Sequence, residues 1–250
     1  MQFRFDQTSI RLTHPDRDGL LSDVAAHFAR GQGFALATIN LDHLVKLRAD
    51  PAFRTAYAAQ DMVVADGNPI IWLSALAGEK AELLPGSDLV LPLCRAAAAA
   101  GLPVSMLGAT EAALQGAADH LAAQVPGFRA GALIAPPMGF DPEGPAAQAA
   151  LAEIAALGPG LCLIALGAPK QERFAALGRQ LAPQTGFASV GAGVEFLSGH
   201  QARAPRWVRA IAMEWLWRAL SAPRRLIPRY ARCFAILPGQ TLAAWRQRRA

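Results

Sequence analysis

Short apolar runs of strand length alternate along the chain with longer segments in which apolar residues recur at helical spacing. The clearest run, residues 161–166, reads LCLIAL. Alternation of this kind predicts an α/β fold. One of the predicted helices is capped by Ser87 or Asp88 and runs to about residue 100. The other strand-like runs occupy residues 34–37, 62–65, 104–108, 130–135 and 187–190.

The run at residues 62–65 ends in a polar turn that holds Asp66, Gly67 and Asn68. Pro69 then opens a second apolar run, and proline suits the first turn of a helix because no hydrogen bond is lost there. Asp66 is therefore expected between a strand and a helix, at the sheet edge where open α/β folds bind ligands. Its carboxylate can serve there as a general base, a hydroxyl-binding group or a metal ligand, or it can only cap the helix.

Polar or small residues follow two further strand-like runs. Thr38 and Asn40 follow residues 34–37, where they can cap the next helix or hydrogen-bond a sugar or nucleotide. Gly191 follows the last run, with Glu195 shortly behind it. A glycine at that point lets a ligand approach the backbone closely.

Gly167 and Pro169 separate the clearest apolar run from a helix that begins with Lys170, Gln171 and Glu172. The N–H groups of this helix start, together with Lys170, can hold a phosphate or a uracil carbonyl, and Gln171 offers a donor and an acceptor to a base edge. The alternative is a solvated first turn. Four strand ends with small or polar residues predict one ligand cleft along the carboxyl edge of a parallel sheet.

Two other local motifs are weaker. Asp16 and Asp18 match the Asp-x-Asp pattern of metal-dependent nucleotide-sugar enzymes, but Gly19 comes directly after them and favours a solvated turn. Gly31 and Gly33 precede their strand, whereas a dinucleotide-binding glycine motif follows its strand.

Composition places the chain among globular proteins, since 53% of its 250 residues are hydrophobic and 17% are charged. Its three cysteines are far apart and suit a reducing cytoplasm. The N-terminus lacks the apolar core of a signal peptide, and no uninterrupted apolar run reaches the roughly 18 residues of a membrane span.

Positive charge gathers at the C-terminal end. Residues 203–250 hold eleven arginines and one acid, Glu214, which gives +10, and because the whole chain carries +5 the first 202 residues carry −5. We therefore expect an α/β core in residues 1–200 and a basic, amphipathic, helical appendage in residues 201–250.

Two segments of this appendage combine arginines with apolar stripes, one after Pro205 and one after Pro223. Such helices lie well in an anionic membrane interface, and they can equally pack on the core or bind nucleic acid. The chain shows no nucleic-acid-binding motif and its core is acidic, so no nucleic acid partner is expected.

Several short motifs occur in order over residues 34–229. The motifs are T-x-N (38–40), V-A-D-G (64–67), P-G-S-D-L (85–89), L-G-A-P-K-Q-E (166–172), F-L-S-G (196–199), R-A-P-x-W (203–207), E-W-L-W-R (214–218) and A-P-R-R (222–225). In this combination the chain resembles the WecG/TagA/CpsF glycosyltransferases of bacteria, glycosyltransferase family 26.

The resemblance implies an inverting transfer of a sugar from a UDP-sugar to a polyprenyl-diphosphate-linked saccharide. Candidate donors are UDP-N-acetylmannosamine, its uronate and UDP-glucose, and the product belongs to cell-surface polysaccharide or exopolysaccharide biosynthesis. The reaction takes place on the cytoplasmic face of the bacterial plasma membrane, where the enzyme is peripheral. The resemblance also implies a Rossmann-like core, an active site completed by the appendage, and no required metal.

Carried over by position, Asp66 resembles the general base and Thr38 a substrate-positioning residue. The arginines that resemble donor-diphosphate ligands are Arg218 and Arg225, with Arg224 or Arg229. Two positions depart from the family pattern. Asn68 stands where an apolar residue is more usual and Glu195 where aspartate is usual, so N-acetylmannosamine specificity is not carried over.

Two rival interpretations remain. The chain can be a peripheral membrane or nucleic-acid-binding module with a nucleotide pocket but no transferase activity, or a metal-dependent enzyme that uses Asp16 and Asp18. The donor sugar, the acceptor glycan and the linkage are open, and self-association is possible.

Overall fold

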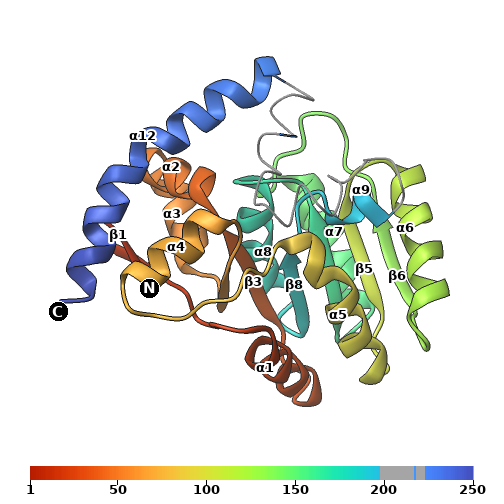
Figure 1. Cartoon of the computed structure of the whole chain (residues 1–250). Helices are drawn as coiled ribbons and strands as arrows, with labels where there is room; N and C mark the ends of the chain where they lie inside the picture. The colour runs from red at the N-terminus through yellow and green to blue at the C-terminus, as the bar shows by residue number, and fades with distance from the viewer. Residues whose placement is uncertain (198–216, 218–222, 250) are drawn as a thin grey trace.

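The protein is described by a computed structural model that covers residues 1–197, 217 and 223–249. Its centre is a six-stranded sheet of parallel strands in the order β4-β3-β8-β7-β5-β6 (Figure 1). The strands overlap the predicted apolar runs, so the prediction of an α/β fold with a parallel sheet is confirmed. They are β3 (Phe34–Ile39), β4 (Met62–Ala65), β5 (Val104–Gly108), β6 (Ala130–Ile134), β7 (Gly160–Ala165) and β8 (Thr185–Ser189).

Helices cover both faces of the sheet, which explains why its strands are apolar throughout rather than alternating with polar residues. One face is covered by α1 (Arg17–Ala29), α5 (Gly86–Ala99), α6 (Glu111–Gln124) and α9 (Gly193–Leu197). The other is covered by α3 (Pro51–Ala58), α7 (Pro145–Ala156) and α8 (Lys170–Leu181). The helices α2 (Leu41–Ala49) and α4 (Asn68–Leu76) follow β3 and β4.

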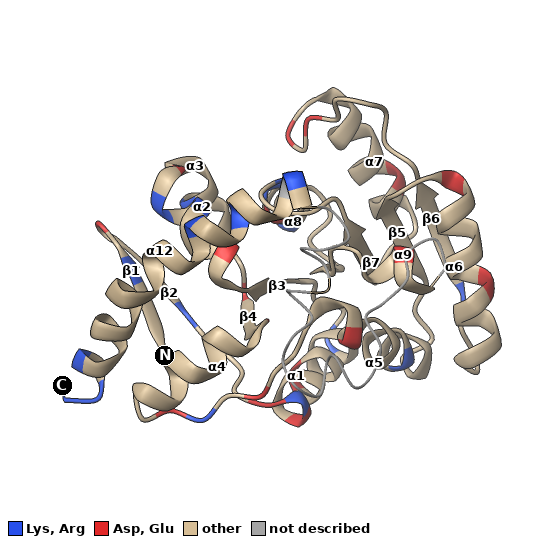
Figure 2. Ribbon diagram, turned by 45° about the horizontal axis from the view of Figure 1, so that its top comes forward, with Lys and Arg blue, Asp and Glu red and all other residues tan. Residues whose placement is uncertain are grey.

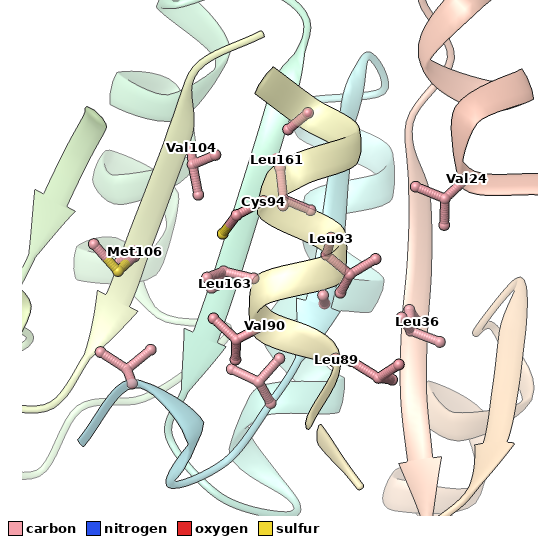
Figure 3. Packing of buried hydrophobic residues seen from close by; sticks show 14 of the residues in the cluster. Val24, Leu36, Leu89, Val90, Leu93, Cys94, Val104, Met106, Leu161 and Leu163 are labelled. Atoms are coloured by element: carbon pink, nitrogen blue, oxygen red, sulfur yellow. The ribbon is translucent and has the colours of Figure 1, made fainter. Parts of the chain in front are cut away.

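The core of the first face shows how the sequence pattern becomes packing. Side chains of a strand alternate between the two faces, so Leu161 and Leu163 of β7 point to one cluster while Cys162 points to the other. Val90 and Cys94, one turn apart on α5, meet these leucines (Figure 3). All five side chains are at most 1% exposed.

The C-terminal helix α12 (Pro223–Gln247) runs along the outside of α2 and α4 (Figure 1). Its Leu226, Cys233 and Ala244 are buried. Near its end Gln247 exchanges two hydrogen bonds with the backbone of Gln2, at 2.6 and 3.1 Å. This part of the appendage therefore packs on the core, one of the alternatives left open by the sequence. Among the residues that the structure describes, no helix is long and apolar enough to cross a membrane.

Several elements differ from the prediction. Asp16 is not part of a free turn, because its Oδ1 accepts a hydrogen bond from Gly19 N at 2.7 Å and caps α1, which continues through Gly19. The cap of α5 is Pro85, without a side-chain hydrogen bond, so the predicted capping by Ser87 or Asp88 is wrong. The helix α3 and the antiparallel pair β1 (Gln2–Phe5) and β2 (Thr8–Arg11) were not predicted from the sequence.

Candidate active site

The parallel sheet brings four predicted strand ends to one edge. The strands β4, β3, β8 and β7 are consecutive neighbours. The residues that follow them therefore succeed one another along the carboxyl edge, in the order Asp66, Asn40, Gly191 and Gly167. In open α/β sheets this edge is where ligands bind.

Asp66 is a half-buried carboxylate whose position is set by β3 and α2. Its backbone N donates to Ile39 O at 2.8 Å, and its Oδ2 accepts a hydrogen bond from Asn40 Nδ2 at 3.1 Å. The N-cap residue of α4 is Gly67, whose φ of +97° favours glycine, so Asp66 is not the helix cap. The carboxylate is thus held on the turn without serving as the N-cap of α4.

Asn40 performs two tasks with the two ends of its amide. Its Oδ1 accepts a hydrogen bond from His43 N at 3.1 Å and caps α2, while its Nδ2 reaches Asp66. The predicted capping role is confirmed, and the same side chain also orients the candidate base.

Substitutions of Asn40 should separate these two tasks. Asn40→Ala removes the cap and should lower the free energy of unfolding by about 1 kcal/mol. Asn40→Ser keeps a capping oxygen but lacks the amide that reaches Asp66, so stability should return while kcat stays about tenfold below wild type. Urea unfolding and initial transfer rates measure the two effects. A wild-type kcat in Asn40→Ser would contradict the orienting role.

Thr38 lies within β3 and is only 5% exposed, so the prediction that it follows the strand and can cap the next helix is wrong, because β3 continues to Ile39 and Asn40 is the cap of α2. Its carbonyl oxygen accepts a hydrogen bond from the hydroxyl of Tyr57, a buried residue of α3, at 2.9 Å. Burial raises the pKa of Tyr57 well above its ordinary value, and the negative charges of Glu172 and Asp66 raise it further. Tyr57 is therefore a neutral hydrogen-bond donor beneath the sheet edge.

His43, in the first turn of α2, and Glu172, in the first turn of α8, form a buried pair. His43 Nε2 lies 3.9 Å from Glu172 Oε1, and the exposed fractions of the two residues are 5% and 0%. Burial lowers the pKa of His43 to about 4 and raises the pKa of Glu172 to about 7. Both shifts favour the neutral forms. Glu172 Oε2 is buried without a hydrogen-bond partner among the described residues.

The first turn of α8 is not a solvated turn, because Gln171 is 3% exposed and Glu172 is fully buried. Gln171 Oε1 accepts from Gly191 N at 3.2 Å, and its Nε2 donates to Glu172 Oε1 at 2.8 Å. Both ends of this amide are thus used inside the fold, where they tie α8 to the turn after β8. Lys170 is exposed, and its Nζ donates to Phe140 O at 2.7 Å.

Stability of the His43 and Glu172 variants should depend on pH in opposite directions. A raised acid pKa means that the contribution of Glu172 to the free energy of unfolding falls as pH rises from 4.5 to about 7. A lowered histidine pKa means that the contribution of His43 rises between about 4 and 6.5. The two trends oppose each other in the wild type.

Relative to wild type, the stability of Glu172→Gln should therefore rise with pH over this window, and that of His43→Gln should fall, each by up to about 3 kcal/mol. Urea unfolding at several pH values checks both. Glu153→Gln, at an exposed position of α7, is the matched control. If the difference in the free energy of unfolding from wild type changed with pH in the same direction for both variants, His43 and Glu172 would not both be neutral in the folded state.

Asp42, in the first turn of α2, joins three parts of the structure. Its Oδ2 lies 2.8 Å from Lys46 Nζ and 3.0 Å from Arg229 Nη2 of α12. Lys46 Nζ also donates to Ala168 O, in the turn before α8, at 2.9 Å. Burial alone raises the pKa of Asp42, but the Lys46 hydrogen bond and the charges of Arg229 and Lys46 outweigh it, so the pKa is lowered.

Two of the four predicted diphosphate-binding arginines have described side chains. Arg218 lies outside the described residues, and so does the side chain of Arg225. Arg224 is exposed, and Arg229 forms the ion pair with Asp42. The other predicted substrate-binding residues lie near the same edge: Gly67, Asn68 and Pro169 flank the starts of α4 and α8, and Glu195 is half-buried on α9.

The described part of the chain offers no metal-ligand cluster. No group of three or more His, Cys, Asp and Glu side chains among those residues is arranged to hold a metal ion. The candidate Asp16 uses its carboxylate to cap α1, while Asp18 is exposed in the first turn of that helix.

Four residues of this layer were not predicted from the sequence, namely Asp42, His43, Lys46 and Tyr57. Asp42 and His43 stand in the first turn of a helix, where an acid is usually explained by the helix dipole alone. The one feature of the sequence that pointed to Asp42 and His43 is that they closely follow Asn40, a polar residue at the end of a strand. Burial of both side chains, and the contacts from α12 and α8, depend on tertiary structure.

A model of the glycosyl transferase WecG/TagA/CpsF family matches residues 5–250 of this chain. The match spans nearly all of the chain, including the edge of the sheet described above and α12.

Proposed function

The chain belongs to the glycosyl transferase WecG/TagA/CpsF family, and from this membership we propose that it is an inverting glycosyltransferase that uses a UDP-sugar. The acceptor in this proposal is a polyprenyl-diphosphate-linked saccharide of a cell-surface polysaccharide or exopolysaccharide. Family membership by itself supports a glycosyltransferase activity, which argues against the binding-module alternative.

The observation that carries the proposal is the Asp66 carboxylate at the carboxyl edge of the sheet, oriented by Asn40. In an inverting transfer, a base takes the proton of the acceptor hydroxyl as its oxygen attacks the anomeric carbon. The bond from that carbon to the UDP oxygen breaks, and UDP leaves with the electron pair. Asp66 is the base, and Thr38, which pairs with Val64 in the neighbouring strand β4, positions the substrate.

The leaving diphosphate gains negative charge, which needs cations or hydrogen-bond donors nearby. Arginine suits this task because its planar fork pairs with two phosphate oxygens. We assign it to the appendage arginines Arg218, Arg224 and Arg225, and we propose that no metal is required. The division into a core (1–200) and an appendage (201–250) and the peripheral position on the inner membrane face belong to the same proposal.

Arg229 has a different place in the proposal. Because it is paired with Asp42, its first role is to hold α12 on α2, and a contact with the donor is secondary. Asn68 and Glu195, which depart from the family pattern, are proposed to influence the choice of sugar.

The test is release of UDP from a panel of UDP-sugars, with a short polyprenyl-diphosphate-linked saccharide as acceptor, with and without a chelator. Turnover that depends on the acceptor, persists in chelator and selects one donor supports the proposal and identifies the sugar. Turnover abolished by the chelator and restored by a divalent cation would favour a metal-dependent mechanism. No transfer with any donor would contradict the proposed substrates.

A further inference from the structure

An apolar groove of about 590 Å³ lies between α4 and α12. Several of its side chains are large and face solvent, including Phe234 (52% exposed), Leu242 (48%) and Trp245 (38%). Grouped apolar exposure of this kind marks an interaction site more often than a scattered surface leucine does. The groove is lined by Leu76, Phe234, Leu237, Pro238, Thr241, Leu242 and Trp245.

The groove is connected to the candidate active site through α4. This helix begins directly after Asp66 and Gly67 and ends at Leu76, which lines the groove. At 1.5 Å per residue, Leu76 lies about 12 Å along the helix from its start. Trp72, 60% exposed, lies halfway between. Trp72 and Leu76 are four residues apart and share one face of α4, so an exposed apolar side chain lies between the turn at Asp66 and the groove.

The charge of α12 matches an amphiphile with an anionic head. The described residues 223–249 contain arginines and no acid. Arg229 and Arg232 lie on the part of the helix that contacts Asp42 of α2, ahead of the groove. At the other end, Arg249 stacks over the ring of Trp245 at 3.6 Å, and basic segments colour this end of the chain in Figure 2.

We propose that this groove binds the isoprenoid chain of the lipid-linked acceptor. This inference rests on the proposed function, and it adds the binding site of the isoprenoid part of the acceptor. The saccharide hydroxyl lies at Asp66, the diphosphate of the acceptor lies near Arg229 and Arg232 of α12, and the isoprenoid chain follows the apolar surface into the groove. Along the acceptor the saccharide is followed by the diphosphate and then by the isoprenoid chain. In the proposed arrangement these parts meet Asp66, the arginines and the groove, in the same order.

The first test measures binding without any transfer. Farnesyl diphosphate is titrated calorimetrically into the full-length protein, with inorganic diphosphate as the reference ligand. Farnesyl diphosphate should bind at least tenfold more tightly than diphosphate, and Leu242→Asp should remove most of this difference. Leu181→Asp, at a position on α8 that is also 48% exposed, should keep it.

The second test measures transfer to the same saccharide carried on farnesyl diphosphate or on methyl diphosphate. In wild type, kcat/KM should be at least tenfold higher for the farnesyl acceptor. Leu242→Asp and Phe234→Asp should bring the ratio of the two values close to one, through KM. Leu181→Asp should leave the ratio unchanged.

The two tests separate failure of the inference from failure of the proposed function. Transfer to both acceptors with equal efficiency keeps the function and overturns the groove assignment. Absence of transfer, with the farnesyl preference and its loss in Leu242→Asp intact, overturns the function and keeps the groove. If Leu242→Asp instead changes only the sedimentation coefficient or only binding to lipid vesicles, the groove is a subunit interface or a membrane contact and the inference is wrong.

Discussion

Replacement of Asp66 by asparagine is expected to lower kcat by a factor of about a hundred to ten thousand, the range typical of a lost general base. Asparagine has nearly the same shape and can still accept the hydrogen bond from Asn40, but it cannot take the proton of the acceptor hydroxyl. Because the side chain is only half-buried, the free energy of unfolding should change by less than about 1 kcal/mol. Rates of UDP release and urea unfolding measure the two quantities.

Asp61, at the other end of the same strand, provides the control. Its Oδ2 accepts hydrogen bonds from Ala35 N at 2.7 Å and Arg179 Nε at 2.8 Å, so its role is structural. Asp61→Asn should therefore lower stability while kcat stays near wild type. If Asp66→Asn kept more than a tenth of the wild-type kcat, a different group would have to be the base.

Much of the fold was predictable because its strands are buried on both faces. A strand covered by helices on both sides must be apolar along its whole length, and such runs stand out between glycines and polar turns. The run at residues 161–166 predicted β7 for this reason. The two-stranded sheet at residues 2–11 was missed because it is small, partly exposed and interrupted by polar residues.

The outer layer of the site was predictable for a related reason. In a parallel sheet every carboxyl end lies at the same edge, so small and polar residues at strand ends, such as Asp66 and Gly191, are brought together by topology. The buried residues beneath this edge, such as Tyr57, His43 and Glu172, were not predictable as part of the site. Glu172 looks like an ordinary acid in the first turn of α8, but it is fully buried where α3 packs on α8 and where His43 of α2 approaches its carboxyl group.

The sequence also did not indicate how α12 is attached, because an acid followed by a lysine four residues later is a common surface pair on a helix. Asp42 and Lys46 have this spacing, but Asp42 is only 8% exposed and its second partner, Arg229, comes from α12. Removing one member of a buried ion pair is costly, because the charges left behind lose their counter-charge. Here Lys46 and Arg229 would be left facing each other.

Asp42→Asn should therefore lower the free energy of unfolding by about 2 kcal/mol, less than for a fully buried pair because Lys46 and Arg229 are partly exposed. Hydrogen exchange should increase first in residues 223–249, ahead of the central sheet. Turnover should fall as well, since α12 brings its arginines to the site in the proposed mechanism.

The double variant Asp42→Asn/Arg229→Gln tests the cause. It removes the uncompensated charge of Arg229, so it should be less destabilised than the sum of the two single variants by about 1 kcal/mol. Arg232→Gln, one turn further along the same helix, replaces an exposed arginine and should show no such coupling to Asp42. Additive effects of Asp42→Asn and Arg229→Gln would mean that the ion pair does not hold α12. Its attachment would then depend on the buried apolar contacts of Leu226 and Cys233.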